Sequence, residues 1–319
     1  MGLTVEPTHV DEDQRALRRM PIPGFQDVEN GLTPEQVGRE GTDRFIQEEA
    51  FFAAYAAYFG RFIDAYREQG IGIGMVMPQN EFNSPQVFPS CTWTTEGLAR
   101  FLPHLGPEMR RRGVEVFIGT LERPDDHLVR PLLEDPTTAQ HVDGVGAQWA
   151  GKGAVPFLHH DFPTLRLYQT EQECGAGRND WRHCRYAWTL LRHFLSNGAT
   201  AYMYWNISLL QGGISRWGWA QNSLVTVDAA AGTYEFTHEY HLLKHVTHYV
   251  QPGARVLPTL SASGFENQLV FRNPDGSLVV VIQNDTGIEQ PVTILLEGRT
   301  ISPVLPADSF STFVVPAGA

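Results

Sequence analysis

The chain has 319 residues, of which 42% are hydrophobic and 11% aromatic, and its formal net charge at pH 7 is -12. This much apolar material can fill the core of one large domain and a small one, which argues against general disorder. The acidic balance disfavours a nucleic-acid partner, because phosphate binding needs a basic surface.

Residues 1–46 are polar, with scattered proline and glycine, and we expect an irregular segment there. A helix is predicted over residues 47–69, because aromatic side chains recur at steps of three and four and would bury one helix face. These side chains are Phe52, Tyr55, Phe59, Phe62 and Tyr66. Gly70 ends the helix, and the apolar residues 71–77 follow as a buried strand.

The alternation of strands and helices continues to about residue 250. Further strands are predicted at residues 114–120, 143–149, 165–170 and 199–205. Further helices are predicted at residues 94–112, 128–141, 180–196 and 235–250. This alternation predicts a parallel sheet with helices packed outside it.

The composition changes after Gly253, and strands then follow one another without helices. They are predicted at residues 268–272, 277–283, 291–296 and 310–315. The first two flank Asn273-Pro-Asp-Gly276, a strong hairpin signal, so we expect a small antiparallel β sandwich. The expected division is an irregular segment at residues 1–46, a (β/α) domain at 47–252 and a β-sandwich domain at 253–319.

Two glutamates come at the points where predicted strands end. Glu81 follows Pro78-Gln79-Asn80, and Glu171 follows Thr170, ninety positions later. Enzymes built on (β/α)8 barrels place catalytic groups at these strand ends, and a retaining glycosidase needs two carboxyl groups about 5 Å apart. We therefore predict that Glu81 and Glu171 are catalytic, with Asn80 placed to donate to the sugar 2-hydroxyl. The alternative is a solvated loop carboxylate in each case.

Glu173 is the rival of Glu171, since both would point to the same side of an extended strand. Trp149 and Trp205 end two further strands and would offer flat rings to the faces of a sugar, unless both are core residues. Other candidates for polar contacts at the same mouth are Gln148, Asn206 and Glu122.

Four histidines recur at metal-like steps on the last predicted helix, namely His238, His241, His245 and His248. That helix lies outside the predicted sheet, so we interpret them as an ordinary helix surface and expect no metal. The three cysteines lack CxxC spacing, which argues against a disulfide framework. No apolar run is long enough to predict a transmembrane helix, and the first residues lack the pattern of a signal sequence.

These stretches resemble glycoside hydrolase family 30, the glucosylceramidase-like enzymes. Gln79-Asn80-Glu81 is similar to the acid/base segment of the family, and Tyr168-Gln-Thr-Glu171 to its nucleophile segment. Further similar stretches lie at residues 144–149, 204–206, 240–254, 271–276 and 305–309, and the match runs from about residue 30 to the end. Phe82 is a departure, because the family usually has proline after the acid/base glutamate.

The resemblance implies a retaining β-glycosidase without metal or other cofactor, in which Glu81 is the general acid/base and Glu171 the nucleophile. It also implies a sugar site formed by Asn80, Gln148, Trp149 and Trp205, to which we add Asn206 as a substrate-binding candidate. Family substrates are β-linked glucosides, β-1,6-glucans, xylosides, xylans and glucosylceramide.

The five predicted strands correspond to barrel strands four to eight of the family. The expected fold class is therefore α/β, a partial (β/α)8 TIM barrel with a C-terminal antiparallel β sandwich. Five parallel strands do not close a barrel, and closure is what removes strand edges. We expect a homo-oligomer, a partner chain or residues 1–46 to cover the open edges. The alternative function is an inactive or partner-dependent fragment that only binds carbohydrate.

Overall fold

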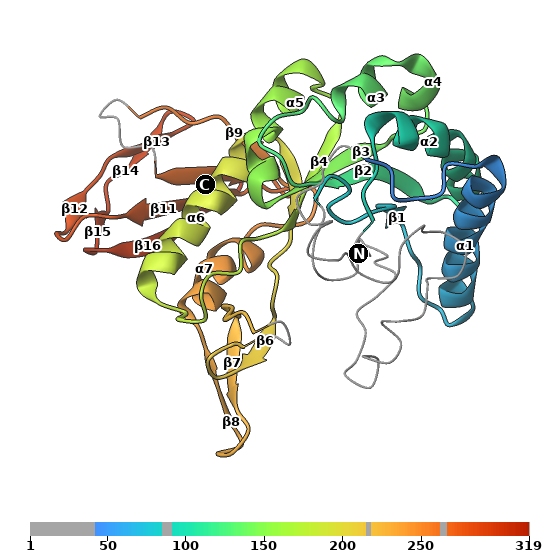
Figure 1. Cartoon of the computed structure of the whole chain (residues 1–319). Coiled ribbons are helices and arrows are strands. Elements are labelled where there is room, and N and C mark those ends of the chain that lie inside the picture. The colour runs from blue at the N-terminus through green and yellow to red at the C-terminus, as the bar shows by residue number, and fades with distance from the viewer. Residues whose placement is uncertain (1–41, 85–90, 215–217, 262–266, 319) are drawn as a thin grey trace. The chain divides into compact units, whose positions relative to one another are not determined.

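The computed structural model of the chain describes residues 42–84, 91–214, 218–261 and 267–318 (Figure 1). These residues form two compact units. The first comprises the described part of Met1–Glu171 together with Asn197–Met203, and the second comprises Gln172–Ser196 and Tyr204–Ala319. Most of the expected irregular segment, residues 1–41, lies outside the described residues. The division at residue 252 into two domains stays a prediction.

The first unit is built on a sheet of five parallel strands in the order β1-β2-β3-β4-β5, as the alternation predicts. The strands are β1 (Met75–Val76), β2 (Glu115–Leu121), β3 (Gly144–Gln148), β4 (Arg166–Glu171) and β5 (Ala199–Tyr202). Within the described residues β1 pairs only with β2 and β5 only with β4, so the sheet does not close. The fold class is confirmed as a partial TIM barrel followed by a β sandwich.

Helices separate these strands along the chain (Figure 1). They are α1 (Glu49–Glu68), α2 (Thr95–Arg110), α3 (Arg130–Glu134), α4 (Pro136–Ala139), η3 (Trp149–Gly153) and α5 (Val155–Asp161). The helix predicted over residues 128–141 is two short helices, because Asp135 is extended and accepts from the backbone N–H of Thr137 to begin α4. No described helix of the chain combines the length and the apolar character that crossing a membrane needs.

Glycine in β3 leaves space for side chains of neighbouring segments that pack against one face of the sheet. The core on this face includes Met75, Met77 and Phe117, with Tyr168 packed against them. A Cβ atom at Gly146 would lie 2.6 Å from Sδ of Met77 and 2.8 Å from Cγ2 of Thr170. Side chains from β4 and from the end of β1 therefore meet over this glycine, which shows that the sheet curves strongly.

The second unit contains α6 (Trp181–Ser196), α7 (His238–Thr247) and the remaining strands. A four-stranded antiparallel sheet has the order β16-β11-β10-β9, and the hairpin from β10 to β11 turns at residues 273–277 as predicted. Its strands are β9 (Arg255–Leu257), β10 (Gln268–Arg272), β11 (Leu278–Asn284) and β16 (Ser309–Val315). Short pairs complete the sandwich, formed by β12 (Gln290–Pro291) with β15 (Val304–Leu305) and by β13 (Ile294–Leu296) with β14 (Arg299–Ile301).

One part of this unit differs from the sequence prediction. Residues predicted to begin a helix at 235 instead form β8 (Thr233–Phe236), which pairs with β7 (Val225–Asp228), and β7 pairs with β6 (Ser208–Leu210). Asp228 accepts from two backbone N–H groups in the turn between β7 and β8. Thr237 then caps α7 by accepting from the N–H of Tyr240, so the helix begins after the strand.

Candidate active site

Glu81 lies on a tight turn that follows β1. Its backbone φ is 45°, in the left-handed region that costs a non-glycine residue about 1–2 kcal/mol. The residue is 9% exposed, and the backbone N–H of Ser84 donates to its carbonyl oxygen at 2.8 Å. A strained and buried position of this kind is typical of functional residues that the surrounding structure holds in place.

Thr120 holds this turn from the neighbouring strand. The backbone N–H of Glu81 donates to Thr120 Oγ1 at 2.9 Å, and the same hydroxyl donates to Asn80 Oδ1 at 2.7 Å. Thr120 is 1% exposed and lies at a register shift, where two residues of β2, Gly119 and Thr120, stand opposite Gly146 of β3. The hydroxyl occupies the carbonyl oxygen of Asn80, so the amide nitrogen is the group of Asn80 that can donate to a sugar.

Gln148 is the last residue of β3, the strand that pairs with β4 and so with Glu171, and its side chain contacts Glu81. Its Nε2 donates to Glu81 Oε1 at 2.7 Å, and the side chain is fully buried. The other polar atom of the amide, Oε1, has no hydrogen-bond partner among the described residues. A buried unpaired acceptor beside a carboxylate is costly in the free protein and is available to a ligand hydroxyl.

Glu171 ends β4 at a β-bulge. Ala147 lies opposite Gln169, but the next pair in the register is Gln148 with Glu171, so Thr170 is an extra residue on β4. Bulges occur next to active sites, where they re-aim a side chain. Neighbouring strands lie about 4.8 Å apart, so Gln148 contacts Glu81 through its side chain and stands beside Glu171 through its backbone.

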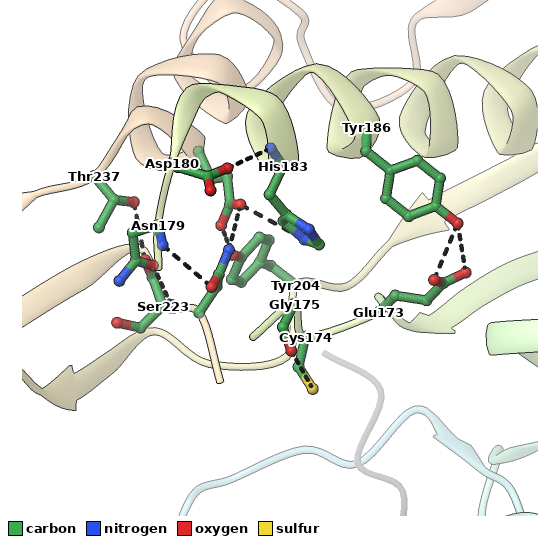
Figure 2. Close-up of polar contacts among 12 residues, drawn as sticks. Glu173, Cys174, Gly175, Asn179, Asp180, His183, Tyr186, Tyr204, Ser223 and Thr237 are labelled. Atoms are coloured by element: carbon green, nitrogen blue, oxygen red, sulfur yellow. Dashed lines mark hydrogen bonds and ion pairs between the residues drawn. The ribbon is translucent and has the colours of Figure 1, made fainter. Parts of the chain in front are cut away.

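The rival glutamate has a different environment. The hydroxyl of Tyr186 on α6 donates to the carboxylate of Glu173, whose two oxygens lie 2.9 and 3.0 Å away, as Figure 2 shows. Burial and this carboxylate together raise the pKa of Tyr186 to about 12. Glu173 therefore serves a contact within the second unit, which supports the preference for Glu171.

The predicted aromatic platforms are distributed over the two units. Trp149 begins η3 directly after Gln148, and its side chain lies outside the described residues. Trp205 and Asn206 belong to the second unit, where Trp205 is half-buried. Asn206 Nδ2 donates to the carbonyl oxygen of Asn222 at 3.1 Å, so its own carbonyl oxygen is the atom that could contact a sugar.

Sequence reasoning missed Glu239, a fully buried carboxylate in the first turn of α7. It accepts from the hydroxyl of Tyr204 and, at 2.9 Å, from Nδ2 of Asn222, while His183 Nε2 lies 3.7 Å away. Burial, followed by the charge of Glu239, raises the pKa of Cys184 to about 12. The network links the segment after β5 to α6 and α7; in the sequence Glu239 has the pattern of a solvated helix residue.

The comparisons with known proteins agree with this architecture. Residues 263–313 match the family model described as the glycosyl hydrolase family 30 beta sandwich domain. An endo-1,6-beta-D-glucanase of Neurospora crassa is 26% identical over 291 residues, which cover 85% of this chain and 60% of that protein. The lysosomal acid glucosylceramidase of Mus musculus is 25% identical over 291 residues, which cover 82% of this chain and 55% of that protein.

Solved structures share the fold. The crystal structure of SrfJ from Salmonella typhimurium matches with a TM-score of 0.76 and 23% identity, over 84% of this chain and 63% of that one. The structure of an endo-beta1,6-glucanase matches with a TM-score of 0.75 and 20% identity, over 85% of this chain and 64% of that one. The chain thus spans about three fifths of the length of the proteins it resembles.

In its partial barrel, its β sandwich and its sequence matches, this chain is similar to glycoside hydrolases. Within that class the similarity is to glycoside hydrolase family 30, whose β-sandwich model matches residues 263–313 and whose likeness extends over 82–85% of the chain in the two relatives above.

Proposed function

We propose that the chain is a retaining β-glycosidase that acts on β-linked glucosides or related sugars such as xylosides, with Glu171 as nucleophile and Glu81 as general acid/base. The observation that carries this proposal is the position of Gln148. Its amide donates to the carboxylate of Glu81, and its backbone stands opposite Glu171 in the register of β3 and β4. Two strand-end carboxylates on either side of one buried amide suit a double displacement at a single sugar.

In the proposed reaction, Glu171 attacks the anomeric carbon while Glu81 protonates the departing oxygen. Glu81 then removes a proton from water, which hydrolyses the glycosyl–enzyme bond and retains the configuration. The hydrogen bond from Gln148 orients Glu81, and the amide nitrogen of Asn80 can donate to the sugar 2-hydroxyl, where such bonds strengthen in the transition state. The names of the two curated relatives support glucose as the sugar, because a β-1,6-glucan and a glucosylceramide both contain it.

The test is hydrolysis of aryl β-glucoside and aryl β-xyloside by the wild type, by Glu171→Ala and by Glu173→Ala. Loss of a covalent nucleophile costs roughly three orders of magnitude or more in kcat. We expect that loss for Glu171→Ala and activity within about threefold of wild type for Glu173→Ala, whose contact to Tyr186 lies at the surface. If wild type and Glu171→Ala are equally inert while sugars still bind, the chain is a carbohydrate-binding protein.

We also infer that another chain, in the first instance a second copy of this one, covers the open edges of the five-stranded sheet. Among the described residues β1 and β5 each have one strand neighbour, and unpaired strand edges are templates for association. Sedimentation velocity should then show an oligomer at micromolar concentration. A monomer that melts cooperatively would contradict this inference.

A further inference from the structure

Three polar side chains gather beside the turn that bears Glu81. Asn83, two residues after Glu81, accepts through Oδ1 from the backbone N–H of Glu122 at 3.3 Å. Arg123 forms an ion pair with the carboxylate of Glu122, and its Nη2 contacts the carbonyl oxygen of Asn83 at 3.5 Å. Glu122 and Arg123 directly follow β2, so the turn and this strand end form one continuous polar surface.

One hydrogen-bond donor of this surface, the side-chain amide of Asn83, has no acceptor among the described residues. Asn83 is 4% exposed, and its Nδ2 has no hydrogen-bond partner among the described residues. The side chains of Glu122 and Arg123 are 19% and 23% exposed, so both remain accessible to a ligand while they are held in place. Burial raises the pKa of Glu122, against the opposing effects of the Ser84 hydrogen bond and the Lys152 charge. A buried donor without a partner, beside two partly accessible charged groups, is suited to the hydroxyls of a sugar.

The strand order puts this surface on one side of the proposed reaction centre. Glu122 follows β2, Gln148 ends β3 and Glu171 ends β4, so a whole strand separates Glu122 from the proposed nucleophile. Asn83, in contrast, is only two residues after Glu81, and it contacts Glu122. The general acid protonates the departing oxygen, so the leaving group lies on the side of Glu81, opposite to the attack by the nucleophile.

We propose that Asn83, Glu122 and Arg123 form a subsite for the leaving group, and that the leaving group it takes is a sugar rather than a lipid. The carboxylate would accept from two hydroxyls, while the guanidinium and the Asn83 amide would donate. A hydrocarbon chain at this place would desolvate both charges and leave the amide unpaired, which is costly. The proposal rests on the proposed function for the direction of the leaving group and extends it to the class of substrate, a β-linked oligosaccharide.

The experiment compares Glu122→Gln with wild type on two substrates that share the attacked sugar. One is a β-1,6-linked glucose trisaccharide, which places a sugar in the leaving-group position. The other is 4-nitrophenyl β-glucoside, which does not. We expect kcat/KM to fall at least tenfold on the trisaccharide and less than twofold on the aryl glucoside. Glu134→Gln, an exposed carboxylate on α3, is the matched control and should change neither value.

Three results would overturn the subsite. Equal losses on both substrates would mean that Glu122 acts on the reaction centre or on folding, and no loss on either would mean that it meets no substrate. Faster hydrolysis of octyl β-glucoside than of the trisaccharide would assign a lipid-like leaving group.

Calorimetric titration with the trisaccharide separates this proposal from the proposed function. If no aryl glucoside is hydrolysed, the proposed function fails, but the subsite still predicts at least tenfold weaker binding to Glu122→Gln than to wild type. Equal binding to both proteins would reject the subsite without reference to catalysis.

Discussion

Replacing Thr120 by valine removes the hydroxyl that holds the turn of Glu81 and leaves the shape of the side chain unchanged. The hydroxyl makes two hydrogen bonds, to the backbone N–H of Glu81 at 2.9 Å and to Asn80 Oδ1 at 2.7 Å. Each is worth about 1 kcal/mol net, and the buried N–H that is left unpaired adds a cost of about 1–3 kcal/mol. We therefore expect a loss of about 3–5 kcal/mol in the free energy of unfolding, measured by urea denaturation.

The same substitution should reduce catalysis. The N–H bond to Thr120 helps to hold Glu81 at a φ of 45°, and the turn can relax without it. If the looser orientation of Glu81 removes about 2 kcal/mol of transition-state stabilisation, kcat/KM on aryl β-glucoside falls roughly 30-fold, since about 1.4 kcal/mol corresponds to a factor of ten. Thr120→Ser keeps the hydroxyl and should retain most of the activity. Wild-type kcat/KM in Thr120→Val, or equal damage in the serine variant, would refute the reasoning.

Two further predictions concern stability. The Tyr55 hydroxyl donates to the buried carbonyl oxygen of Pro78 at 3.0 Å, so Tyr55→Phe should lower the free energy of unfolding by about 1–3 kcal/mol in urea denaturation; an unchanged midpoint would contradict this. Burial, and next the charge of His241, lower the pKa of His245, so its contribution to stability is complete above the unfolded pKa of about 6.5 and is lost as pH falls below it toward the folded pKa. In His245→Gln the difference in unfolding free energy between pH 7.5 and pH 5.5 should shrink; an unchanged difference would show that other groups cause it.

The strands that bear the proposed catalytic residues could be predicted from local pattern. An apolar run followed by a polar strand end identifies Glu81 and Glu171, and the helix before the first strand follows from its aromatic spacing. The parallel order of the five strands follows from the alternation of elements. Each of these features depends on residues that are neighbours in the chain.

The register shifts could not be predicted, because they depend on pairing between strands. Thr120 has the sequence pattern of an ordinary strand residue, and its contacts arise only where β2 bulges opposite Gly146. The bulge at Thr170 likewise brings Glu171, and not its neighbour, opposite Gln148. Side-chain periodicity alone assumes a regular ladder and therefore misassigns residues beyond a bulge.

The misplaced helix start has a comparable cause. The helical pattern from His238 onward extends backward through Glu235 and Phe236 without interruption in composition. The turn at Asp228 and the pairing of β8 with β7 determine that these residues are a strand, and Thr237 sets the boundary. Tertiary pairing overrides the local preference here.

The most direct measurement is to identify the residue that becomes covalently attached to the sugar. A 2-deoxy-2-fluoro-β-glucoside with a good leaving group slows both steps of a retaining reaction, so the glycosyl–enzyme accumulates and can be mapped by peptide mass spectrometry. We predict a label on Glu171, which is present in Glu173→Ala and absent in Glu171→Gln. A label on any other carboxylate, or hydrolysis of aryl β-glucoside without a trapped intermediate, would contradict it.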